Sequence, residues 1–210
     1  MAKERFLTPR LYAALELAFK LHGRDARKGC QVPALAHLLS VCALVQTDGG
    51  DEDEAIAALL HDSLEDKSEH ITREEIQSRF GVRVLDIIEV STDTASDFKG
   101  GEKEPWEVRK TRYIEHIKTA DPKLLRVTIA DKIDNARAIL ADHRRIGSEV
   151  WRRFNAPQAR VVWYYTESTK AYLQAGVTSP LLEDLQALVN QMEVLPRATL
   201  KYKTQRRFVS

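Results

Sequence analysis

Hydrophobic residues recur at three- and four-residue spacing through almost the whole chain, which is the period of one face of an α-helix. The first stripe follows Thr8-Pro9, a capping hydroxyl and a proline that suit a helix start. A second stripe follows Pro33, and few polar residues occupy its other faces, which predicts a helix buried nearly all round. The two stripes consist of Leu11, Leu15, Ala18, Phe19 and His22, then Leu35, Leu38, Leu39, Cys42 and Val45.

Capping signals divide the next part of the chain. Asp51-x-x-Glu54 and Thr72-x-x-Glu75 have the spacing of capping boxes, in which two side chains satisfy free backbone N–H groups. The first predicts one helix over Glu52 to Asp66, and the second predicts a short helix that ends at Gly81. Further helical patterns cover 84–88, 106–119, 125–140 and 148–175 and follow Ser179-Pro180.

The segment from 92 to 106 contains Gly100-Gly101, Pro105 and many charges, so it is predicted to be a loop. No run of strand length alternates with period two. We therefore predict a single all-α domain over residues 1–200, followed by a basic, frayed tail at 201–210.

Composition narrows the class of protein. Of 210 residues, 43% are hydrophobic and 30% charged, as in globular proteins. Lys plus Arg is 32 against 31 for Asp plus Glu, and a net charge of +1 argues against a dedicated nucleic-acid binder. The two cysteines, Cys30 and Cys42, fit reduced thiols. The chain opens without a signal-peptide core, and its longest apolar stretch, Ala34 to Val45, is too short to cross a membrane. These features predict a cytoplasmic protein.

The densest polar segment is His61-Asp62-Ser63-Leu64-Glu65-Asp66, directly after an apolar run. On a continuous helix, His61 would lie one turn from Glu65, and Asp62 one turn from Asp66. Charged groups beside a core stripe are costly to desolvate unless they are paired or coordinated, and a metal ion would remove that cost. An acidic helix end that faces water explains the hexapeptide equally well.

Two further residues favour the metal. His37 lies on the most apolar predicted helix, and Asp131 lies on a long amphipathic one, with Asn135 one turn later. The order His37, His61-Asp62, Asp131 resembles that of the HD superfamily of metal-dependent phosphohydrolases. The resemblance implies that these four residues are the metal ligands of a helical fold. The other histidines show no such pairing: His22, His70, His116 and His143.

The flanking residues narrow the resemblance to the Rel/SpoT-type alarmone hydrolase domains. Arg27-Lys28-Gly29 before Pro33 is similar to that family's approach to its first ligand, and the Glu65-Asp66 pair follows the His-Asp motif as it does there. Glu75–Val82 and Ala130–Arg137 resemble two later family segments, so the likeness covers about residues 10 to 145. In length the chain resembles the small, hydrolase-only members. It departs from the family at Pro33-Ala34, where a Pro-aromatic pair is usual.

The resemblance implies hydrolysis of the 3′-pyrophosphate of guanosine tetra- or pentaphosphate at a Mn²⁺ ion. Two imidazoles and two carboxylates suit Mn²⁺, and Fe²⁺, Co²⁺ or Zn²⁺ are compatible. Glu65 and Asp66 are then the acid/base groups, and either one can handle the proton. Arg27, Lys28 and Lys132 are candidates to hold the pyrophosphate, and Asn135 to contact the nucleoside.

Two other interpretations stay open. One is a 5′-nucleotidase or dNTP phosphohydrolase of the wider superfamily; the other is a non-catalytic nucleotide sensor that keeps its metal. The Glu65-Asp66 pair and the Arg27-Lys28 segment favour the alarmone hydrolase. In every case the expected partner is a small nucleotide rather than a nucleic acid or a membrane, and the pattern carries no signal for an oligomeric state.

Overall fold

The computed structural model describes residues 8–95, 98 and 100–196, so the tail predicted for 201–210 lies outside the described residues. Within the described part, the chain forms ten α-helices and two 3₁₀ helices, and the prediction of an all-α fold is confirmed. No helix among these residues is long and apolar enough to cross a membrane. The helices are α1 (Pro9–His22), α2 (Ala34–Thr47), α3 (Glu52–Leu60), α4 (Ser63–Asp66), α5 (Arg73–Phe80), α6 (Val82–Ser91), α7 (Trp106–Thr119), η1 (Pro122–Leu124), α8 (Arg126–Ile146), η2 (Gly147–Arg153), α9 (Gln158–Gln174) and α10 (Pro180–Glu193).

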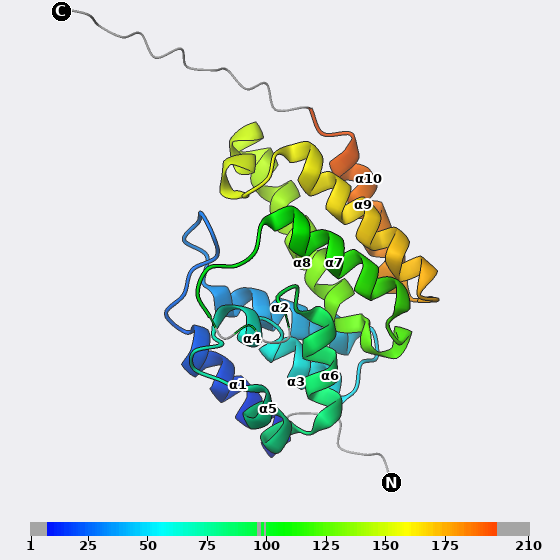
Figure 1. Ribbon diagram of the computed structural model, residues 1–210. Helices are drawn as coiled ribbons and strands as arrows, with labels where there is room; N and C mark the ends of the chain where they lie inside the picture. Colours follow the sequence, from blue (N-terminus) through cyan, green and yellow to red (C-terminus); the bar gives the residue numbers. More distant parts are fainter. Residues whose placement is uncertain (1–7, 96–97, 99, 197–210) are drawn as a thin grey trace, which may run out of the picture.

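Two groups of helices meet along α8. In the first, α3 packs against α1, α2 and α6; in the second, α7 packs against α9, and α9 against α10. Figure 1 shows the first group at one end of the molecule and the second at the other. Because α8 contacts both α2 and α10, it joins the two groups and brings residues from distant parts of the sequence to one place.

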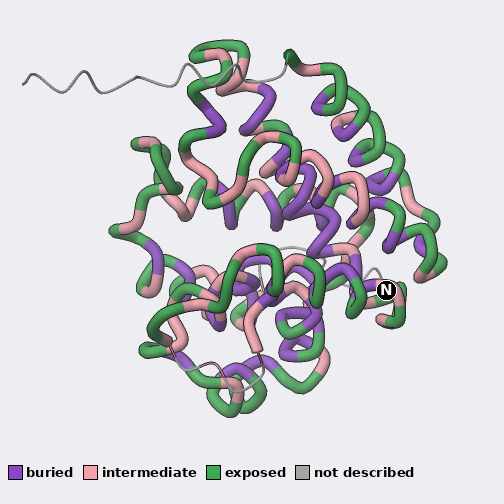
Figure 2. Tube along the Cα trace, turned by 45° about the horizontal axis from the view of Figure 1, so that its top comes forward, coloured by how far each residue is buried: buried purple, intermediate pink, exposed green. Residues whose placement is uncertain are grey.

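The core lies where these helices face one another. Buried positions repeat along each helix on the side turned to its neighbours, as the tube in Figure 2 shows. Helix α3 is the most enclosed, because every residue from Ala55 to Leu60 is buried. Its central place among α1, α2, α6 and α8 explains why residues 55–60 are apolar on all sides.

The segment after α3 differs from the prediction of one continuous helix over 52–66. The helix stops at Leu60, and α4 starts at Ser63. The side chains at the break bond to the last carbonyls of α3: His61 Nδ1–H donates to the Ala58 oxygen at 2.8 Å, and the Ser63 hydroxyl donates to the Leu60 oxygen at 2.5 Å. Such local side-chain bonds compete with the helical ladder, so the turn falls at His61-Asp62.

The segment between α1 and α2 is a closed loop. The backbone N–H of Arg27 donates to the Val32 oxygen at 2.8 Å, and that of Ala34 donates to the Asp25 oxygen at 2.9 Å. Gly29 at its tip has φ +73°, and an added Cβ would lie 2.6 Å from the Arg153 side chain. This close approach requires glycine and holds the loop against η2.

Candidate metal centre and its pocket

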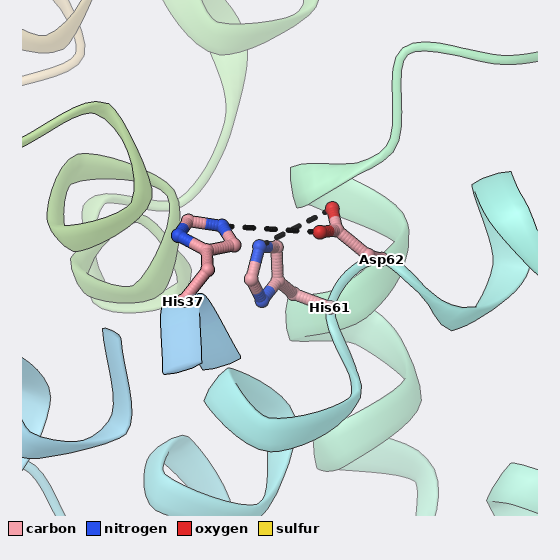
Figure 3. A group of neighbouring side chains, drawn as sticks. All are labelled: His37, His61 and Asp62. Carbon is pink, nitrogen blue, oxygen red and sulfur yellow. Dashed lines mark ion pairs between the residues drawn. The ribbon is translucent and has the colours of Figure 1, made fainter. Parts of the chain in front are cut away.

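The structure brings the four predicted ligands together from two helices and one turn. His37 lies on α2, Asp131 lies on α8, and His61-Asp62 form the turn between α3 and α4. Asp131 Oδ1 is 3.2 Å from His37 Nε2 and 3.7 Å from His61 Nε2, and Asp62 Oδ1 is 3.2 Å from His61 Nε2. Ligand atoms of His37, His61 and Asp62 all lie within 4.8 Å of one another, and Figure 3 shows these side chains pointing to a common centre.

Hydrogen bonds fix the orientation of both imidazoles. His61 Nδ1 is engaged by the Ala58 oxygen, and His37 Nδ1 lies 2.6 Å from Asp134 Oδ2. Each ring therefore turns its Nε2 lone pair to the centre, as metal-ligating histidines do. The Nε2 atom of His61 is buried and has no hydrogen-bond partner. A divalent cation would satisfy that atom and the facing carboxylates, so the donor set fits the ion that the sequence implied.

The carboxylates of the cluster raise the pKa values of its two histidines. Burial opposes protonation of His37, but the carboxylates of Asp131 and Asp134 outweigh it and raise the pKa of His37 to about 9. The pKa of His61 is also raised, because Asp62 and Asp131 outweigh its burial. Because protons and a metal ion compete for the two rings, metal binding is expected to weaken as pH falls.

Asp131 is held by its neighbours on α8. Lys132 Nζ donates to Asp131 Oδ2 at 2.6 Å, and the side-chain amide of Asn135 donates to Oδ1. The Lys132 ammonium is buried and also lies 5.1 Å from the ring centre of Tyr113 and 5.6 Å from that of Tyr164. Burial opposes its charge, but Asp131 keeps the pKa of Lys132 well above its usual range. Lys132 therefore acts on the ligand Asp131 directly.

The other residues predicted to bind substrate have different surroundings. The two terminal nitrogens of Arg27 contact Asp134 and Asn135. Lys28 is exposed, and its ammonium donates to the Asn155 side chain at 2.8 Å. Only Lys28 of these four residues thus lies at the surface, while Arg27, Lys132 and Asn135 contact residues around the His/Asp cluster.

The acid pair lies at a less enclosed place. Glu65 and Asp66 share the Lys103 ammonium, at 2.9 and 3.0 Å, and Arg109 Nη1 lies 3.6 Å from Glu65. The side chain of Glu65 is 23% exposed, against 54% for Asp66. Burial and the nearby Asp93 carboxylate raise the pKa of Glu65, in opposition to Lys110 and Lys103. Glu65 is therefore the carboxylate of the pair whose surroundings favour holding a proton.

Sequence reasoning missed two anionic supports, Asp93 and Asp134. Asp93 is buried at the end of α6, where Arg109 and the Lys110 ammonium both donate to its carboxylate. Burial opposes its ionisation, but these two cations outweigh it and lower the pKa of Asp93. Both aspartates pair with residues from other helices, and no local spacing in the sequence signals such partners.

One pocket of about 1040 Å³ lies beside the His/Asp cluster and the acid pair. Every residue predicted to bind metal or substrate or to transfer a proton lines it, except the enclosed His61. The pocket also contains His22, for which no role was predicted; this residue is buried, with its Nδ1 at 3.2 Å from Asp25 Oδ2. Among the described residues, the cluster of His37, His61 and Asp62 is the one group of three or more ligating side chains.

The helical fold and the His/Asp cluster together define a class, that of all-α proteins with a divalent-metal site. Comparison with known families gives the particular one: the family described as "HD domain" matches residues 14–156. The chain belongs to the HD domain family and is a metal-dependent hydrolase. The resemblance predicted from the sequence is confirmed at this level.

Two similar proteins are named as pyrophosphohydrolases. The chain is 31% identical over 173 residues to the Xenopus tropicalis guanosine-3′,5′-bis(diphosphate) 3′-pyrophosphohydrolase MESH1, over 81% of this chain and 87% of the relative. It is 33% identical over 127 residues to the Aquifex aeolicus (strain VF5) guanosine-3′,5′-bis(diphosphate) 3′-pyrophosphohydrolase, over 60% of this chain but only 17% of that longer protein.

Two solved structures share the fold. The protein lmo0812 from Listeria monocytogenes EGD-e superposes with a TM-score of 0.64 and 26% identity, over 74% of this chain and 97% of that chain. A metazoan ortholog of SpoT superposes with a TM-score of 0.68 and 24% identity, over 90% of this chain and 99% of that chain. The second likeness supports the fold alone.

Proposed function

We propose that this protein is a Mn²⁺-dependent pyrophosphohydrolase that removes the 3′-pyrophosphate of guanosine tetra- or pentaphosphate. One observation carries the proposal: two histidines and two aspartates meet at the wall of a pocket that also contains the Glu65-Asp66 pair. A site that only binds a nucleotide has no use for a proton-transferring carboxylate beside its metal.

The names of the relatives supply the substrate. The Xenopus and Aquifex proteins are both named for 3′-pyrophosphohydrolase activity on guanosine-3′,5′-bis(diphosphate). The match to the Xenopus protein spans most of both chains, which supports the same substrate class for this chain. A nucleotide substrate and the free thiols of Cys30 and Cys42 fit a protein of the cytoplasm.

His37, His61, Asp62 and Asp131 would hold the ion. Mixed imidazole and carboxylate ligands favour Mn²⁺ over the all-oxygen preference of Mg²⁺ or Ca²⁺. When bound, the ion would polarise a phosphoryl oxygen and lower the pKa of a water molecule at the site. The protein's own part is to fix the ligands, hold the pyrophosphate and move the proton.

Glu65 is our candidate for that proton transfer. Its burial and the nearby Asp93 raise the pKa of Glu65 above that of an ordinary carboxylate, and a shift in this direction favours a general acid or base at neutral pH. Asp66 is more exposed and shares the Lys103 ammonium, so it is placed to steady that lysine beside Glu65. The exposed Lys28 and the buried Lys132 add positive charge to the pocket, which favours a pyrophosphate group.

A nucleotide panel with Mn²⁺ tests the proposal and its rivals together. We expect pyrophosphate plus GDP or GTP from guanosine tetra- or pentaphosphate. A 5′-nucleotidase would release orthophosphate from nucleoside monophosphates, and a dNTP phosphohydrolase would act on dNTPs. Binding of the alarmone without any release would make the protein a sensor. The Asp62→Ala variant controls for contaminating phosphatases, because it should lack the activity.

A further inference from the structure

The guanidinium of Arg27 reaches across to α8 and uses both of its terminal nitrogens there. Arg27 Nη1 donates to Asp134 Oδ2 at 2.7 Å, and Nη2 donates to the Asn135 side-chain oxygen. The Arg27 side chain is only 21% exposed. Its planar fork thus binds two neighbouring residues of one helix, a geometry that a lysine ammonium cannot reproduce.

Each of these two residues in turn supports a different candidate ligand. The Asp134 oxygen that accepts from Arg27 is also the one that lies 2.6 Å from His37 Nδ1, and its other oxygen accepts from the Ser40 hydroxyl. The Asn135 amide donates to Asp131. Two separate chains of hydrogen bonds therefore run from Arg27, one to the histidine on α2 and one to the aspartate on α8.

We propose that Arg27 is a positioning residue of the metal centre, holding His37 through Asp134 and Asp131 through Asn135. This inference rests on the proposed function, because it presumes that the cluster binds an ion. It changes the role that the sequence suggested for Arg27, which was direct contact with the pyrophosphate. An arginine that binds the phosphate would have to give up both of these partners.

We call the two hydrogen bonds from Arg27 to Asp134 and Asn135 the clamp. The loop that carries Arg27 is itself tied to the helix of His37. Backbone hydrogen bonds from Arg27 to Val32 and from Ala34 to Asp25 close the loop immediately before α2, the helix of His37. The loop and the ligands are thus joined both through the backbone and through the guanidinium. Coupling of this kind is reciprocal, so an ion in the cluster should also order the loop.

Mn²⁺ affinity, measured by titration calorimetry, tests the clamp without relying on turnover. We expect Asp134→Asn to weaken binding about 10- to 100-fold, the usual cost of losing a carboxylate behind a ligating histidine. Arg27→Gln should weaken it about tenfold although Arg27 touches no ligand, and Arg27→Lys should fall in between. The double variant should bind Mn²⁺ more weakly than Asp134→Asn alone, because Arg27→Gln also breaks the chain through Asn135 to Asp131. Its loss should still be smaller than the two single effects combined, because both changes break the chain through Asp134.

Arg24→Gln is the matched control, since it removes an exposed arginine of the same loop, and it should bind Mn²⁺ as the wild type does. Amide hydrogen exchange of residues 25–33 should slow on adding Mn²⁺ to the wild type and much less in Arg27→Gln. Should Arg27→Gln fail to fold by circular dichroism, Arg27→Lys keeps the charge and serves instead.

Wild-type Mn²⁺ affinity in a folded Arg27→Gln variant, or in Arg27→Lys if only that one folds, would overturn the clamp. If KM rose at the same time, Arg27 would be a substrate ligand and the proposed function would stand. A wild-type protein that binds no Mn²⁺ at all would overturn the proposed function and the clamp together.

Discussion

The His/Asp cluster and the Glu65-Asp66 pair share one pocket but are built in different ways. In the cluster, α2, α8 and the turn between α3 and α4 contribute residues, and His37, His61 and Asp131 each have a hydrogen bond that orients them. The acid pair contacts Lys103 and Arg109, which come from the segment that precedes α7 and from α7 itself. The exposed fraction differs as well: the side chains of His37, His61 and Asp131 are 8%, 2% and 12% exposed, against 23% for Glu65 and 54% for Asp66. Asp62, at 35%, is the exposed member of the cluster.

The difference matches two tasks. A metal ligand must keep its geometry within fractions of an ångström, and the burial of His37, His61 and Asp131, each with a hydrogen bond that orients it, provides this. A group that transfers protons must exchange them with substrate and water, which needs partial exposure and a tunable pKa. Variants of the two regions should therefore fail differently, the first by losing metal and the second by losing turnover alone.

The largest effect is expected in the cluster. Asp62→Ala removes a carboxylate that faces His37 and His61 and should abolish hydrolysis together with Mn²⁺ binding. Elemental analysis of the purified protein and a pyrophosphate-release assay measure both properties. Asp184→Ala, which removes an exposed carboxylate on α10, should change neither. Normal turnover in Asp62→Ala would exclude this site as the catalytic one.

The acid pair should show the opposite behaviour. Glu65→Gln keeps the size of the side chain but removes its capacity to move a proton, so turnover should fall about 10²- to 10⁴-fold while Mn²⁺ stays bound. Metal content and kcat are to be measured on the same sample. Near-wild-type turnover at full occupancy would end the catalytic assignment of Glu65. Loss of metal together with turnover would instead show that Glu65 is a ligand or supports one.

Metal removal should lower stability by a moderate amount. An ion that binds only the folded state at a concentration 100-fold above its Kd stabilises the protein by about 2.7 kcal/mol. For a domain of this size that corresponds to a fall in Tm of about 5 to 10 °C when Mn²⁺ is removed with a chelator. Asp62→Ala should show no such difference between Mn²⁺ and chelator. An equal response in both proteins would mean that Mn²⁺ binds elsewhere.

The smallest effect should come from Lys103. Its ammonium opposes the influences that raise the pKa of Glu65, so Lys103→Ala should raise that pKa further. The limb of the kcat–pH profile that Glu65 controls should then move to higher pH, with Mn²⁺ affinity unchanged. Lys118→Ala is the control, because that lysine pairs with Glu115 on the same helix and not with the acid pair. An unmoved profile, or one that moves to lower pH, would contradict the role given to Glu65.

Local sequence patterns correctly predicted much of the fold. The Thr72 cap, the end at Gly81 and the span of α7 agree with prediction, because capping side chains and helical periodicity act over a few residues. The single helix expected over 52–66 was wrong for a reason of the same local kind, since His61 and Ser63 bond to the carbonyls before them. The spacing of hydrophobic residues does not show where side chains compete with the backbone for these hydrogen bonds.

The residues behind the site could not be predicted from spacing. Asp134 is three residues after Asp131, yet its partners are His37 on α2 and Arg27 in the loop before it. Lys132 was expected to meet a phosphate, but the fold places it against Asp131 and the rings of Tyr113 and Tyr164 from α7 and α9. Which faces of distant helices meet is settled only by packing in three dimensions.

The most direct test of the account is anomalous diffraction from crystals of the protein grown with Mn²⁺. We predict one strong manganese peak bonded to His37, His61, Asp62 and Asp131, at ligand distances of about 2.0–2.3 Å. The Asp134 contact to His37 Nδ1 should be kept in that crystal. The absence of a peak between these four side chains, or a peak on other residues of the pocket, would contradict the account.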